Sequence, residues 1–453
     1  MNIIILAAGK GTRMKSTLPK VMQCLAGRPM LSFVLETARS LDPQSLIVVY
    51  GYGKDQVLAH YADQTGICWV EQRQQLGTGD AVRQGMSEIK DSGSVMVLYG
   101  DVPCILPETL NKMAALANDQ RLILLTATLD DPTGYGRIVR DDSGRVIKIV
   151  EQKDATESQK RISEINTGIL LAPNDRLKGW LSKLTNDNVQ GEYYLTDIVE
   201  MAVADEVEVV TVHPKYRFEI EGANHFGQLE LLERTYQRYL AENLMSDGVR
   251  LADAGRIDIR GQLICGTDVF IDVGCVFEGK VNLGNNVSVG PNCVLKNVTI
   301  ADNTAIDAFC HLEASTVGEG AKIGPYARLR PGAALKNDVH IGNFVEIKNA
   351  VVGNHSKINH LSYIGDADIG KRVNIGAGTI TCNYDGTNKY RTVIEDDVFV
   401  GSDTQLVAPV KVKEGATIGA GTTLTKEAPA NKLTVSRARQ MTIDNWQRPK
   451  KSK

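Results

Sequence analysis

The sequence predicts an α/β domain with a mostly parallel sheet, then a connecting helix, then a parallel β-helix. Three patterns support this prediction. Short apolar runs alternate with amphipathic stretches over residues 1–222, apolar residues recur at helical spacing over residues 228–245, and an aliphatic residue returns about every six positions over residues 283–424. The periods differ, so each pattern indicates a different architecture. The expected domains are 1–222, 223–248 and 249–453.

The first domain is expected to contain a doubly wound α/β sheet. Buried strands separated by helical patterns are typical of this fold. In such sheets ligands bind beyond the carboxyl ends of the strands, so the residues that follow each strand are candidate site residues. The expected strands are 3–6, 46–50, 95–99 and 122–128.

The turn after the first strand has the composition of an anion cradle. Residues 6–14 read Leu-Ala-Ala-Gly-Lys-Gly-Thr-Arg-Met, and Lys20 follows shortly after. Small residues let backbone N–H groups close around phosphate oxygens, while Arg13 and Lys20 add positive charge. The turn is not a Walker loop, and the third glycine of a dinucleotide fingerprint would fall at Met14. Taken alone, such a turn is equally compatible with a purely structural role.

Two further strand ends carry polar groups. Asp101 follows the strand 95–99, where Mg²⁺ bound to its carboxylate would reach phosphate oxygens. Gln72 and the segment 76–79, Leu-Gly-Thr-Gly, offer amide and backbone groups suited to the edge of a base. An aspartate after a strand is more often a helix or turn cap. Asp101 therefore indicates a metal site only together with the polar residues at the other strand ends.

A connecting helix is predicted from the apolar residues spaced along 228–245, and Gly248 is expected to end it. A coiled-coil dimer is the alternative. The apolar stripe is short for a coiled coil, so packing against the chain's own domains is favoured.

The hexapeptide period determines how distant residues meet in the third domain. Three corners make a coil of about eighteen residues, and successive coils lie roughly 4.8 Å apart. One-residue slips in the register shorten some coils by one residue. The long step between Ile375 and Ile394 indicates that residues 381–389 leave the coil as a loop, and such loops usually carry function.

His360 is a candidate general base on an outward face of the β-helix. An imidazole with an ordinary pKa near 6.5 can accept a proton at neutral pH, although a lone surface histidine more often has no such role. The register places Asn343 below His360 and Ala377 above it, and it places Arg330 beneath Lys348. Stacked cations repel unless an anion lies beside them, which predicts a phosphate site.

Together these segments resemble a known family. The motifs L-A-A-G-x-G-T-R-M, L-P-K, Q-L-G-T-G, Y-G-D-V-P, G-Y-G-R-I and E-I-N-T-G resemble the sugar-1-phosphate nucleotidyltransferases. The motifs G-P-Y-A-R-L-R-P-G, N-F-V-E-I-K, H-L-S-Y-I-G-D and N-I-G-A-G-T-I-T-C-N-Y-D-G extend the likeness into the β-helix. Nearly end to end, the chain is similar to bifunctional bacterial N-acetylglucosamine-1-phosphate uridyltransferases/glucosamine-1-phosphate acetyltransferases.

For the first domain, the resemblance implies transfer of UMP from UTP to N-acetylglucosamine-1-phosphate, which gives UDP-N-acetylglucosamine and pyrophosphate. Arg13 and Lys20 would neutralise charge during catalysis, and Asp101 with Asn224 would bind Mg²⁺. The implied nucleotide and sugar-phosphate residues are Leu6, Ala7, Ala8, Gly9, Lys20, Gln72, Gly77, Thr78, Tyr99, Gly100, Asp101, Gly136, Glu151, Asn166 and Asn224.

One departure from the family pattern lies beside the expected metal ligand. Asn224 is present, but the family usually has Val-Asn-x-Arg before Gln-Leu, and this chain reads Ala-Asn-His-Phe-Gly over residues 223–227, without the arginine. The local support of the metal position is therefore open. His225 is expected to be a surface side chain rather than a third ligand.

For the third domain, the resemblance implies acetylation of glucosamine-1-phosphate by acetyl-CoA, with His360 as the base. Asn359 and Ser362 replace commoner residues of the family without removing a functional group. The implied amino-sugar phosphate residues are Arg330, Lys348, Tyr363, Asn374, Asn383 and Tyr384, and the implied acetyl-CoA residues are Ala377, Ser402, Ala420 and Arg437.

The resemblance also implies a left-handed β-helix and a homotrimer with acetyl-transfer sites between subunits. The product would supply precursors of peptidoglycan and lipopolysaccharide. The sequence alone does not count subunits.

Composition excludes several other classes. The formal net charge of −3 offers no broad basic field for nucleic acid, and no run of eighteen apolar residues predicts a membrane span. The eight cysteines form no Cys-x-x-Cys pair, which argues against zinc. The apolar N-terminal stretch is too short for a signal peptide, so a cytoplasmic location is expected.

Two alternatives are weaker than the bifunctional enzyme. A single-activity sugar-phosphate nucleotidyltransferase with a structural β-helix would have no reason to keep His360, Lys348 and the loop 381–389 together. A non-catalytic assembly subunit would be expected to lose Arg13, Lys20 or Asp101.

Overall fold

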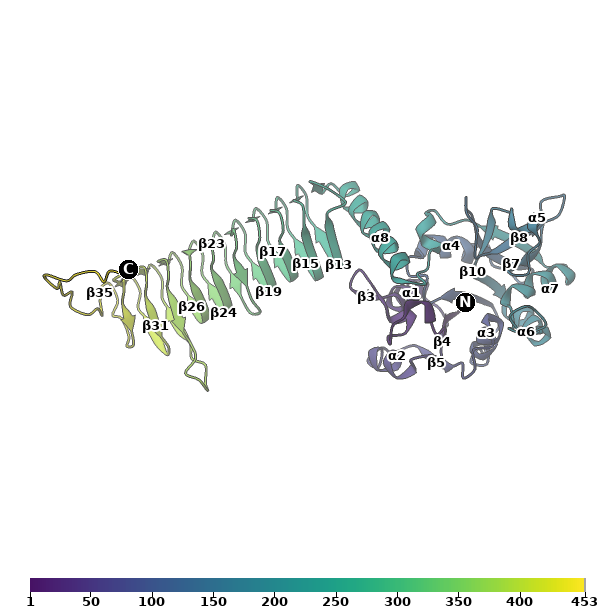
Figure 1. Cartoon of the computed structure of the whole chain (residues 1–453), viewed down its shortest axis with the longest axis horizontal. Coiled ribbons are helices and arrows are strands. Elements are labelled where there is room, and N and C mark those ends of the chain that lie inside the picture. The colour runs from purple at the N-terminus through teal and green to yellow at the C-terminus, as the bar shows by residue number, and fades with distance from the viewer. Residues whose placement is uncertain (452–453) are drawn as a thin grey trace. The chain divides into compact units, whose positions relative to one another are not determined.

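The computed structural model describes residues 1–451 and divides into two compact units, Met1–Tyr236 and a second unit that begins at Gln237. The boundary falls inside α8 (Phe226–Ser246), a continuous helix at the place where the sequence predicts one (Figure 1). The predicted connecting helix is therefore confirmed, while its assignment as a separate domain at 223–248 stays a prediction. None of the described helices is long and apolar enough to cross a bilayer.

A mostly parallel sheet forms the first unit, with the strand order β11-β7-β10-β6-β1-β4-β5 and with β8 and β9 attached through β10. β1 pairs in parallel with β4 and β6, whereas β10 is antiparallel to β6 and β7. The predicted α/β fold is confirmed. The strands are β1 (Asn2–Ala7), β4 (Ser45–Tyr50), β5 (Cys68–Glu71), β6 (Ser94–Tyr99), β7 (Arg121–Thr128), β8 (Gly136–Arg140), β9 (Val146–Val150), β10 (Glu164–Pro173) and β11 (Glu208–Val212); β2 (Cys24–Leu25) and β3 (Arg28–Pro29) form a separate hairpin.

Helices cover both faces of this sheet because its central strands are apolar on both sides. Ile3 and Ile5 of β1 pack with α1 and α4, while Ile4 packs with α3, α6 and α7 on the other face. Alternate side chains of a strand point to opposite faces, so a continuous apolar run is buried on both. The helices are α1 (Met30–Ser40), α2 (Lys54–His60), α3 (Thr78–Met86), α4 (Pro107–Ala115), α5 (Glu157–Lys160), α6 (Asn174–Lys183) and α7 (Ile198–Ala204).

The second unit is a parallel β-helix whose short strands stack coil upon coil (Figure 1). Ile341, Ile358 and Ile375 lie in register in one stack and are all buried, as the hexapeptide pattern predicts. The strands of one sheet are β12 (Arg250–Leu251), β14 (Phe270–Ile271), β16 (Ser288–Val289), β18 (Ala305–Ile306), β20 (Lys322–Ile323), β23 (His340–Asn343), β25 (Lys357–His360), β27 (Asn374–Ile375), β30 (Phe399–Val400), β33 (Thr417–Ile418) and β35 (Leu433–Thr434).

A second sheet of the β-helix carries the longer strands, some of which bend around a corner. Its main strand order runs from β13 to β34, with β22, β29 and β32 beside it. The strands are β13 (Ile257–Cys265), β15 (Cys275–Leu283), β17 (Val294–Ile300), β19 (His311–Val317), β21 (Arg328–Leu329), β22 (Ala334–Leu335), β24 (Glu346–Val352), β26 (Tyr363–Ile369), β28 (Ile380–Cys382), β29 (Thr392–Ile394), β31 (Gln405–Val407), β32 (Val410–Val412) and β34 (Thr423–Leu424).

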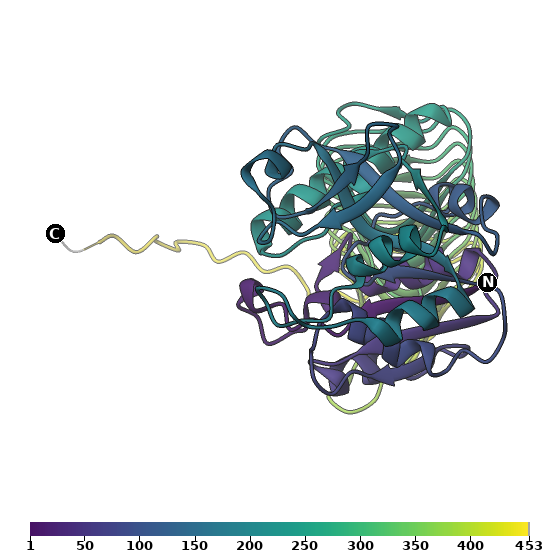
Figure 2. The same cartoon turned by 90° about the vertical axis from the view of Figure 1, so that its right-hand side faces the viewer.

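The predicted loop leaves the coil between β28 and β29. Tyr384 and Lys389 form an isolated antiparallel bridge, and the Asp385 carboxylate accepts hydrogen bonds from the backbone N–H groups of Thr387 and Asn388. The loop is therefore a short structured hairpin. After β35 the chain leaves the β-helix as an extended tail (Figure 2).

α8 covers the first coil of the β-helix. The side-chain amide of Gln237 donates to the carbonyl oxygen of Ile259 at 2.8 Å and accepts from the Ile259 N–H at 2.7 Å. Ala241 of the same helix is buried against the aliphatic core. Gln237 therefore bonds both backbone groups of a residue in β13, the strand at this end of its sheet.

Candidate active sites

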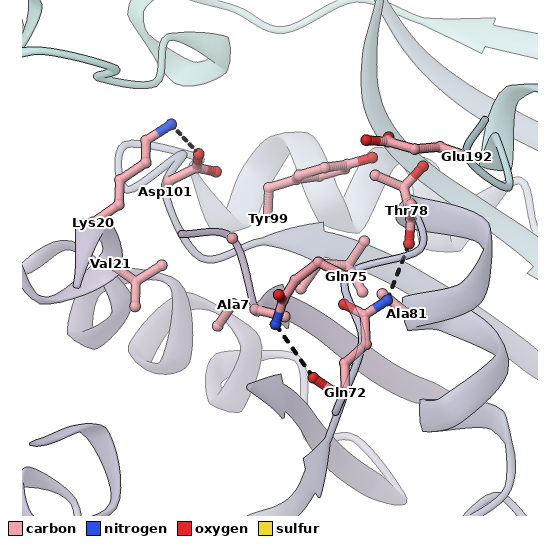
Figure 3. A pocket seen from close by; sticks show the side chains of 14 residues that line it. Ala7, Lys20, Val21, Gln72, Gln75, Thr78, Ala81, Tyr99, Asp101 and Glu192 are labelled. Atoms are coloured by element: carbon pink, nitrogen blue, oxygen red, sulfur yellow. Dashed lines mark hydrogen bonds and ion pairs between the residues drawn. The ribbon is translucent and has the colours of Figure 1, made fainter. Parts of the chain in front are cut away.

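A cavity of about 300 Å³ lies at the carboxyl ends of β1 and β6, the edge at which the sequence predicts a ligand site (Figure 3). It is lined by backbone and small side chains on one side and by Lys20, Asp101 and Tyr99 on the other. The predicted residues that line it are Leu6, Ala7, Ala8, Gly9, Lys20, Gln72, Gly77, Thr78, Tyr99 and Asp101. The lining also includes Val21, Gln75, Ala81 and Glu192, which the sequence did not indicate.

The absence of a side chain has a different structural role at Gly9 and at Gly77. A Cβ on Gly9 would meet no protein atom within 4 Å, so this part of the turn faces open space. Gly77 has φ +109° and lies so close to Tyr193 that a Cβ would be 2.6 Å from its carbonyl oxygen. Gly9 leaves room for a ligand, whereas Gly77 allows α3 to begin beside the chain at Tyr193.

The orientation of the Gln72 amide follows from its protein partners. Its Nε2 donates to the carbonyl oxygen of Gly77 at 3.2 Å and to the Asp80 carboxylate at 2.8 Å. Asp80 and the carbonyl can only accept, so the amide nitrogen must face them. The side-chain oxygen of Gln72 is then the atom left to accept a hydrogen bond from a ligand.

Asp101 and Asn224, the predicted metal ligands, are far apart in the sequence, and the fold of the first unit brings them together. Lys20 Nζ forms an ion pair with Asp101 (Figure 3). It also donates to Asn224 Oδ1 at 2.7 Å, and Arg13 donates to the same oxygen at 2.8 Å. One ammonium group thus contacts both oxygens, which shows that a single cation can reach both. Hard carboxylate and amide oxygens are suitable ligands for Mg²⁺, which usually keeps several waters as well.

Beside the departure from the family pattern, Gln228 holds the backbone at Asn224. The Gln228 side chain accepts a hydrogen bond from the Asn224 N–H at 2.8 Å. His225 is exposed, and its Nδ1 accepts from the Gln228 N–H at 3.2 Å. As predicted, His225 is a surface side chain, and within residues 1–451 no group of three His, Cys, Asp or Glu side chains forms a metal cluster.

Gly136, Glu151 and Asn166, the predicted sugar residues, lie together behind Tyr99. Asn166 is in register with Gly136, and Asn166 and Tyr99 line the same small cavity. A Cβ on Gly136 would lie 3.5 Å from the Glu151 carboxylate oxygens. Gly100, also predicted, donates its N–H to the Leu6 carbonyl oxygen at 2.9 Å and so connects the ends of β6 and β1.

Burial shifts the pKa values of the acids beside this cavity. Burial raises the pKa of Glu151, although a 3.0 Å hydrogen bond from Thr196 counteracts part of the shift. Burial and the charge of Glu151 raise the pKa of Asp197 to about 6. Burial and the charges of Glu151 and Asp101 also raise the pKa of Tyr99, so its hydroxyl group stays protonated at neutral pH.

His360 lies exposed at the end of β25, as predicted, with Asn343 below it in register. The distance between His360 Nδ1 and Asn343 Oδ1 is 2.9 Å. Because an amide oxygen only accepts, Nδ1 of the neutral ring carries the hydrogen and Nε2 keeps its lone pair. Ser362 donates to the His360 carbonyl oxygen at 2.8 Å and holds the following corner.

The predicted cations lie on the neighbouring sheet, past the corner that follows His360. Leu329 pairs with Ile347, which places Arg330 beside Lys348 as the register predicts. Arg330 donates to Glu346 at 2.8 Å, and this carboxylate raises the pKa of Arg330. Lys389 of the loop lowers the pKa of Lys348 by its proximity, with a further contribution from Arg330. Three cations therefore gather at this corner.

Of the other predicted sugar-phosphate residues, Tyr363, Asn383 and Tyr384 lie on the sheet and loop that carry these cations, whereas Asn374 lies on the sheet of His360. Tyr363 is in register with Glu346, and Asn374 follows on the next coil beside Lys357. Asn383 is buried at the base of the loop, whereas Tyr384 is exposed and donates its hydroxyl to the Gly386 carbonyl oxygen at 2.6 Å.

The predicted acetyl-CoA residues form a column above His360. Ile358, Ile375, Val400 and Ile418 are in register, so His360, Ala377, Ser402 and Ala420, two places after each, also stack. Arg437 of the tail reaches the same end, since a Cβ on Gly421 would lie 3.5 Å from its side chain. The structure thus brings together His360, the candidate general base, and the column in which the coenzyme is expected.

Glu192 and Thr196 are the clearest residues that the sequence did not indicate. Glu192 lies in an irregular segment after α6, and Thr196 lies in the short 3-10 helix Leu195–Asp197 that follows. The N–H of Gly79 donates to the Tyr193 carbonyl oxygen of this segment at 2.8 Å. A segment without regular period gives no register, so its contacts with the cavity were not predictable from spacing. The only available signal was the Gly-Glu-Tyr-Tyr run at 191–194, which resembles no strand or helix pattern.

Comparison with known families assigns each half of the chain. Residues 3–161 match the MobA-like NTP transferase domain, residues 259–360 the GMPPB C-terminal domain, and residues 391–426 the bacterial transferase hexapeptide (six repeats). The hexapeptide match and the parallel coils agree with the expected left-handed β-helix. A solved UDP-glucose pyrophosphorylase complexed with UDP-glucose aligns with 52% of this chain and 98% of its own, with 18% identity and a TM-score of 0.45.

Full-length relatives share both halves in the same order. The chain is 58% identical over 453 residues to the bifunctional protein GlmU of Azoarcus sp. (strain BH72), covering 100% of each chain. It is 60% identical over 452 residues to that of Cupriavidus metallidurans, covering 100% of this chain and 99% of the relative, and 59% identical to that of Dechloromonas aromatica, covering 100% of each. Such identity across both candidate sites shows that the chain belongs to the family of the bifunctional protein GlmU.

Proposed function

We propose that this enzyme acetylates glucosamine-1-phosphate with acetyl-CoA and then transfers UMP from UTP to the resulting N-acetylglucosamine-1-phosphate. The products of the second step are UDP-N-acetylglucosamine and pyrophosphate. The observation that carries the proposal is the presence of two separate polar sites on two units of one chain. One surrounds Lys20 and Asp101 at the strand ends of an α/β sheet, and the other surrounds His360 on the β-helix.

In the uridylyl transfer, a phosphate oxygen of the sugar attacks the α-phosphorus of UTP while the bond to the departing pyrophosphate breaks. Arg13 and Lys20 lie beside Asn224 and Asp101, so positive charge is available where the pyrophosphate gathers negative charge. Mg²⁺ held by Asp101 and Asn224 would neutralise further charge on the phosphates. No covalent enzyme intermediate is needed, because positioning and electrostatics supply the rate.

Recognition of the base and the sugar follows from hydrogen-bond orientation. The Gln72 oxygen is left as an acceptor, which suits the ring N–H of uracil. Tyr99, protonated at neutral pH, and the buried Glu151 offer a donor and an acceptor to the sugar hydroxyl and acetamido groups.

In the acetyl transfer, His360 Nε2 takes a proton from the amine as its nitrogen bonds to the thioester carbonyl carbon. Coenzyme A then leaves as the thiolate and recovers a proton. The 2.9 Å contact with Asn343 holds the imidazole in the tautomer that this step requires. Arg330, Lys348 and Lys389 supply the charge for the substrate phosphate.

We also propose a homotrimer with acetyl-transfer sites between subunits, in the cytoplasm, where UTP and acetyl-CoA are present. An exposed aromatic stack supports an interface near His360. Phe309, Tyr326 and Phe344 stack with centroid distances of 4.9 and 5.3 Å, and exposed Leu361 continues this corner beside His360. Contiguous exposed apolar groups of this kind mark association surfaces. Light scattering would measure the mass, and a monomer at assay concentration would contradict this part of the proposal.

The test of the function is incubation with glucosamine-1-phosphate, acetyl-CoA, UTP and Mg²⁺, each omitted in turn, with the products weighed by mass spectrometry. Omitting UTP is expected to leave N-acetylglucosamine-1-phosphate, and omitting acetyl-CoA to stop both products. UMP transfer to supplied N-acetylglucosamine-1-phosphate without any acetylation would favour the alternative, a single-activity nucleotidyltransferase with a structural β-helix.

A further inference from the structure

Asp366 is a buried acid on the β-helix for which the acetyl-transfer mechanism has no direct use. It lies on β26 and is 8% exposed. Asn349, on the coil below, donates its amide to Asp366 Oδ1 at 2.6 Å, and Asn383, on the coil above, donates its amide to Oδ2. Each carboxylate oxygen therefore accepts a hydrogen bond from a side-chain amide.

This acid is ionised. Burial raises the pKa of Asp366, but the hydrogen bonds from Asn349 and Asn383 and the charges of Lys389 and Lys348 outweigh burial, so the net pKa lies below its ordinary value. A buried carboxylate is unfavourable unless it is paired, and here amides and cations surround it. The arrangement thus combines a negative charge with two of the three cations expected to bind the substrate phosphate.

The corner itself does not require a carboxylate. Register places Asn297, Ala314 and Gly332 at the same corner on earlier coils, and all three have φ between 42° and 81°, as Asn349 and Asp366 do. An amide, a methyl group and a hydrogen atom satisfy the left-handed turn at those coils. Among these stacked corner residues, only Asp366, at the coil beside the loop and the cations, is an acid. The carboxylate is therefore not needed to build the corner and must have another role.

We infer that Asp366 is a positioning residue of the acetyl-transfer site that fixes the amide of Asn383 and holds Lys348 and Lys389 together for the substrate phosphate. This inference rests on the proposed function of that face. Because a carboxylate only accepts, the Asn383 NH₂ group must face Asp366, and its oxygen must point elsewhere. Asn383 is then an acceptor for an N–H or O–H of the amino sugar, while the phosphate, which has only acceptor oxygens, contacts the cations.

The test is Asp366→Asn in the full-length protein. An amide at this position sets an NH₂ group against Asn349 or Asn383 and removes the counter-charge of the lysines. We expect the KM for glucosamine-1-phosphate to rise about tenfold or more, the size expected for losing a hydrogen bond to a charged group. The KM for acetyl-CoA and the rate of UMP transfer are expected to change less than about twofold.

Asp368→Asn is the matched control. Asp368 lies two residues further along the same strand, is about half exposed, and pairs with Arg391 on the surface. The same chemical change there is expected to leave every KM within about twofold, as for most exposed ion pairs. Equal effects of the two variants, or an unchanged KM for the amino sugar in Asp366→Asn, would overturn the inference.

A second pair of variants decides the matter if Asp366→Asn does not fold. Asn383→Ala removes the amide that Asp366 orients, whereas Asn349→Ala removes only the donor on the coil below. We expect the KM for glucosamine-1-phosphate to rise in the first variant and to stay near the wild-type value in the second, and equal values would contradict the inference. Absence of acetylation by the wild-type protein would instead reject the proposed function.

Discussion

The nucleotide site and the acetyl-transfer site bring distant residues together by different geometries. In the first unit, Lys20, Asp101 and Asn224 come from three segments whose meeting depends on the strand order of the sheet. In the β-helix, Asn343, His360 and Ala377 meet because consecutive coils stack in register. Topology sets the first site and repeat length sets the second. The two sites should therefore respond independently to substitution.

Asp101→Ala should give the largest separation between the two sites. Loss of a ligand carboxylate is expected to lower Mg²⁺-dependent pyrophosphate release by roughly 10³-fold or more, because the metal stabilises phosphate charge by several kcal/mol. Acetylation is expected to continue at the wild-type rate. Release of pyrophosphate is measured with a coupled phosphate assay, with the exposed Asp119→Ala as control. Retained pyrophosphate release would remove Asp101 from its proposed role.

His360→Ala tests the converse. Loss of a general base is expected to slow acetyl transfer by roughly 10² to 10⁴-fold while UMP transfer continues. The thiol of released coenzyme A can be followed by absorbance with a disulfide reagent. His355→Ala is the control. His355 is an exposed histidine that precedes His360 in the sequence and lies beside Asp338, so its replacement should leave both activities at the wild-type level. A parallel loss of both activities would contradict independent sites.

Asn343→Ala tests whether Asn343 orients the imidazole of His360. Without the 2.9 Å contact the imidazole is no longer held in one tautomer, and the kcat of acetyl transfer is expected to fall by about tenfold. Asn343→Asp keeps an acceptor for Nδ1–H and should recover most of the rate. If the alanine variant keeps the wild-type kcat, the orientation of His360 must depend on other contacts.

Asp197→Asn should show the smallest effect, and only in the first unit. The pKa of Asp197 is raised from 3.8 to about 6. Between these values the folded state holds more protons than the unfolded state, so Asp197 favours folding below pH 3.8 and this contribution is lost as the pH rises through 6. The variant should therefore gain stability relative to the wild type as the pH increases, by about 1 kcal/mol at pH 7 after allowance for solvent screening. Urea unfolding at several pH values measures the difference, and a constant difference from pH 4 to pH 7 would contradict it.

The periodic parts of the molecule could be predicted from the sequence because their geometry repeats. The register of Asn343, His360 and Ala377, and that of Arg330 with Lys348, follows from counting residues per coil. The ends of β1 and β6 were predictable because buried parallel strands end in polar residues at one edge of the sheet.

Contacts that depend on side-chain rotamers could not be predicted. Thr196 donates to Glu151 from the short 3-10 helix Leu195–Asp197, and Gln228, near the start of α8, accepts from the Asn224 N–H through a rotamer that spacing does not determine. Asp366 reads in the sequence as one more polar corner residue. It is buried, and its carboxylate is bonded by Asn383 at the base of the loop, a contact that the spacing of residues does not indicate.

The Gln237 amide bonds backbone groups at the end of the stack of coils. A parallel strand at the end of such a stack presents unpaired N–H and C=O groups, which can template the addition of another chain. By offering one donor and one acceptor to Ile259, the side chain imitates a peptide group of a coil that is not there. With these two groups bonded, this part of the end strand cannot pair with another chain, and α8 closes the β-helix at its beginning.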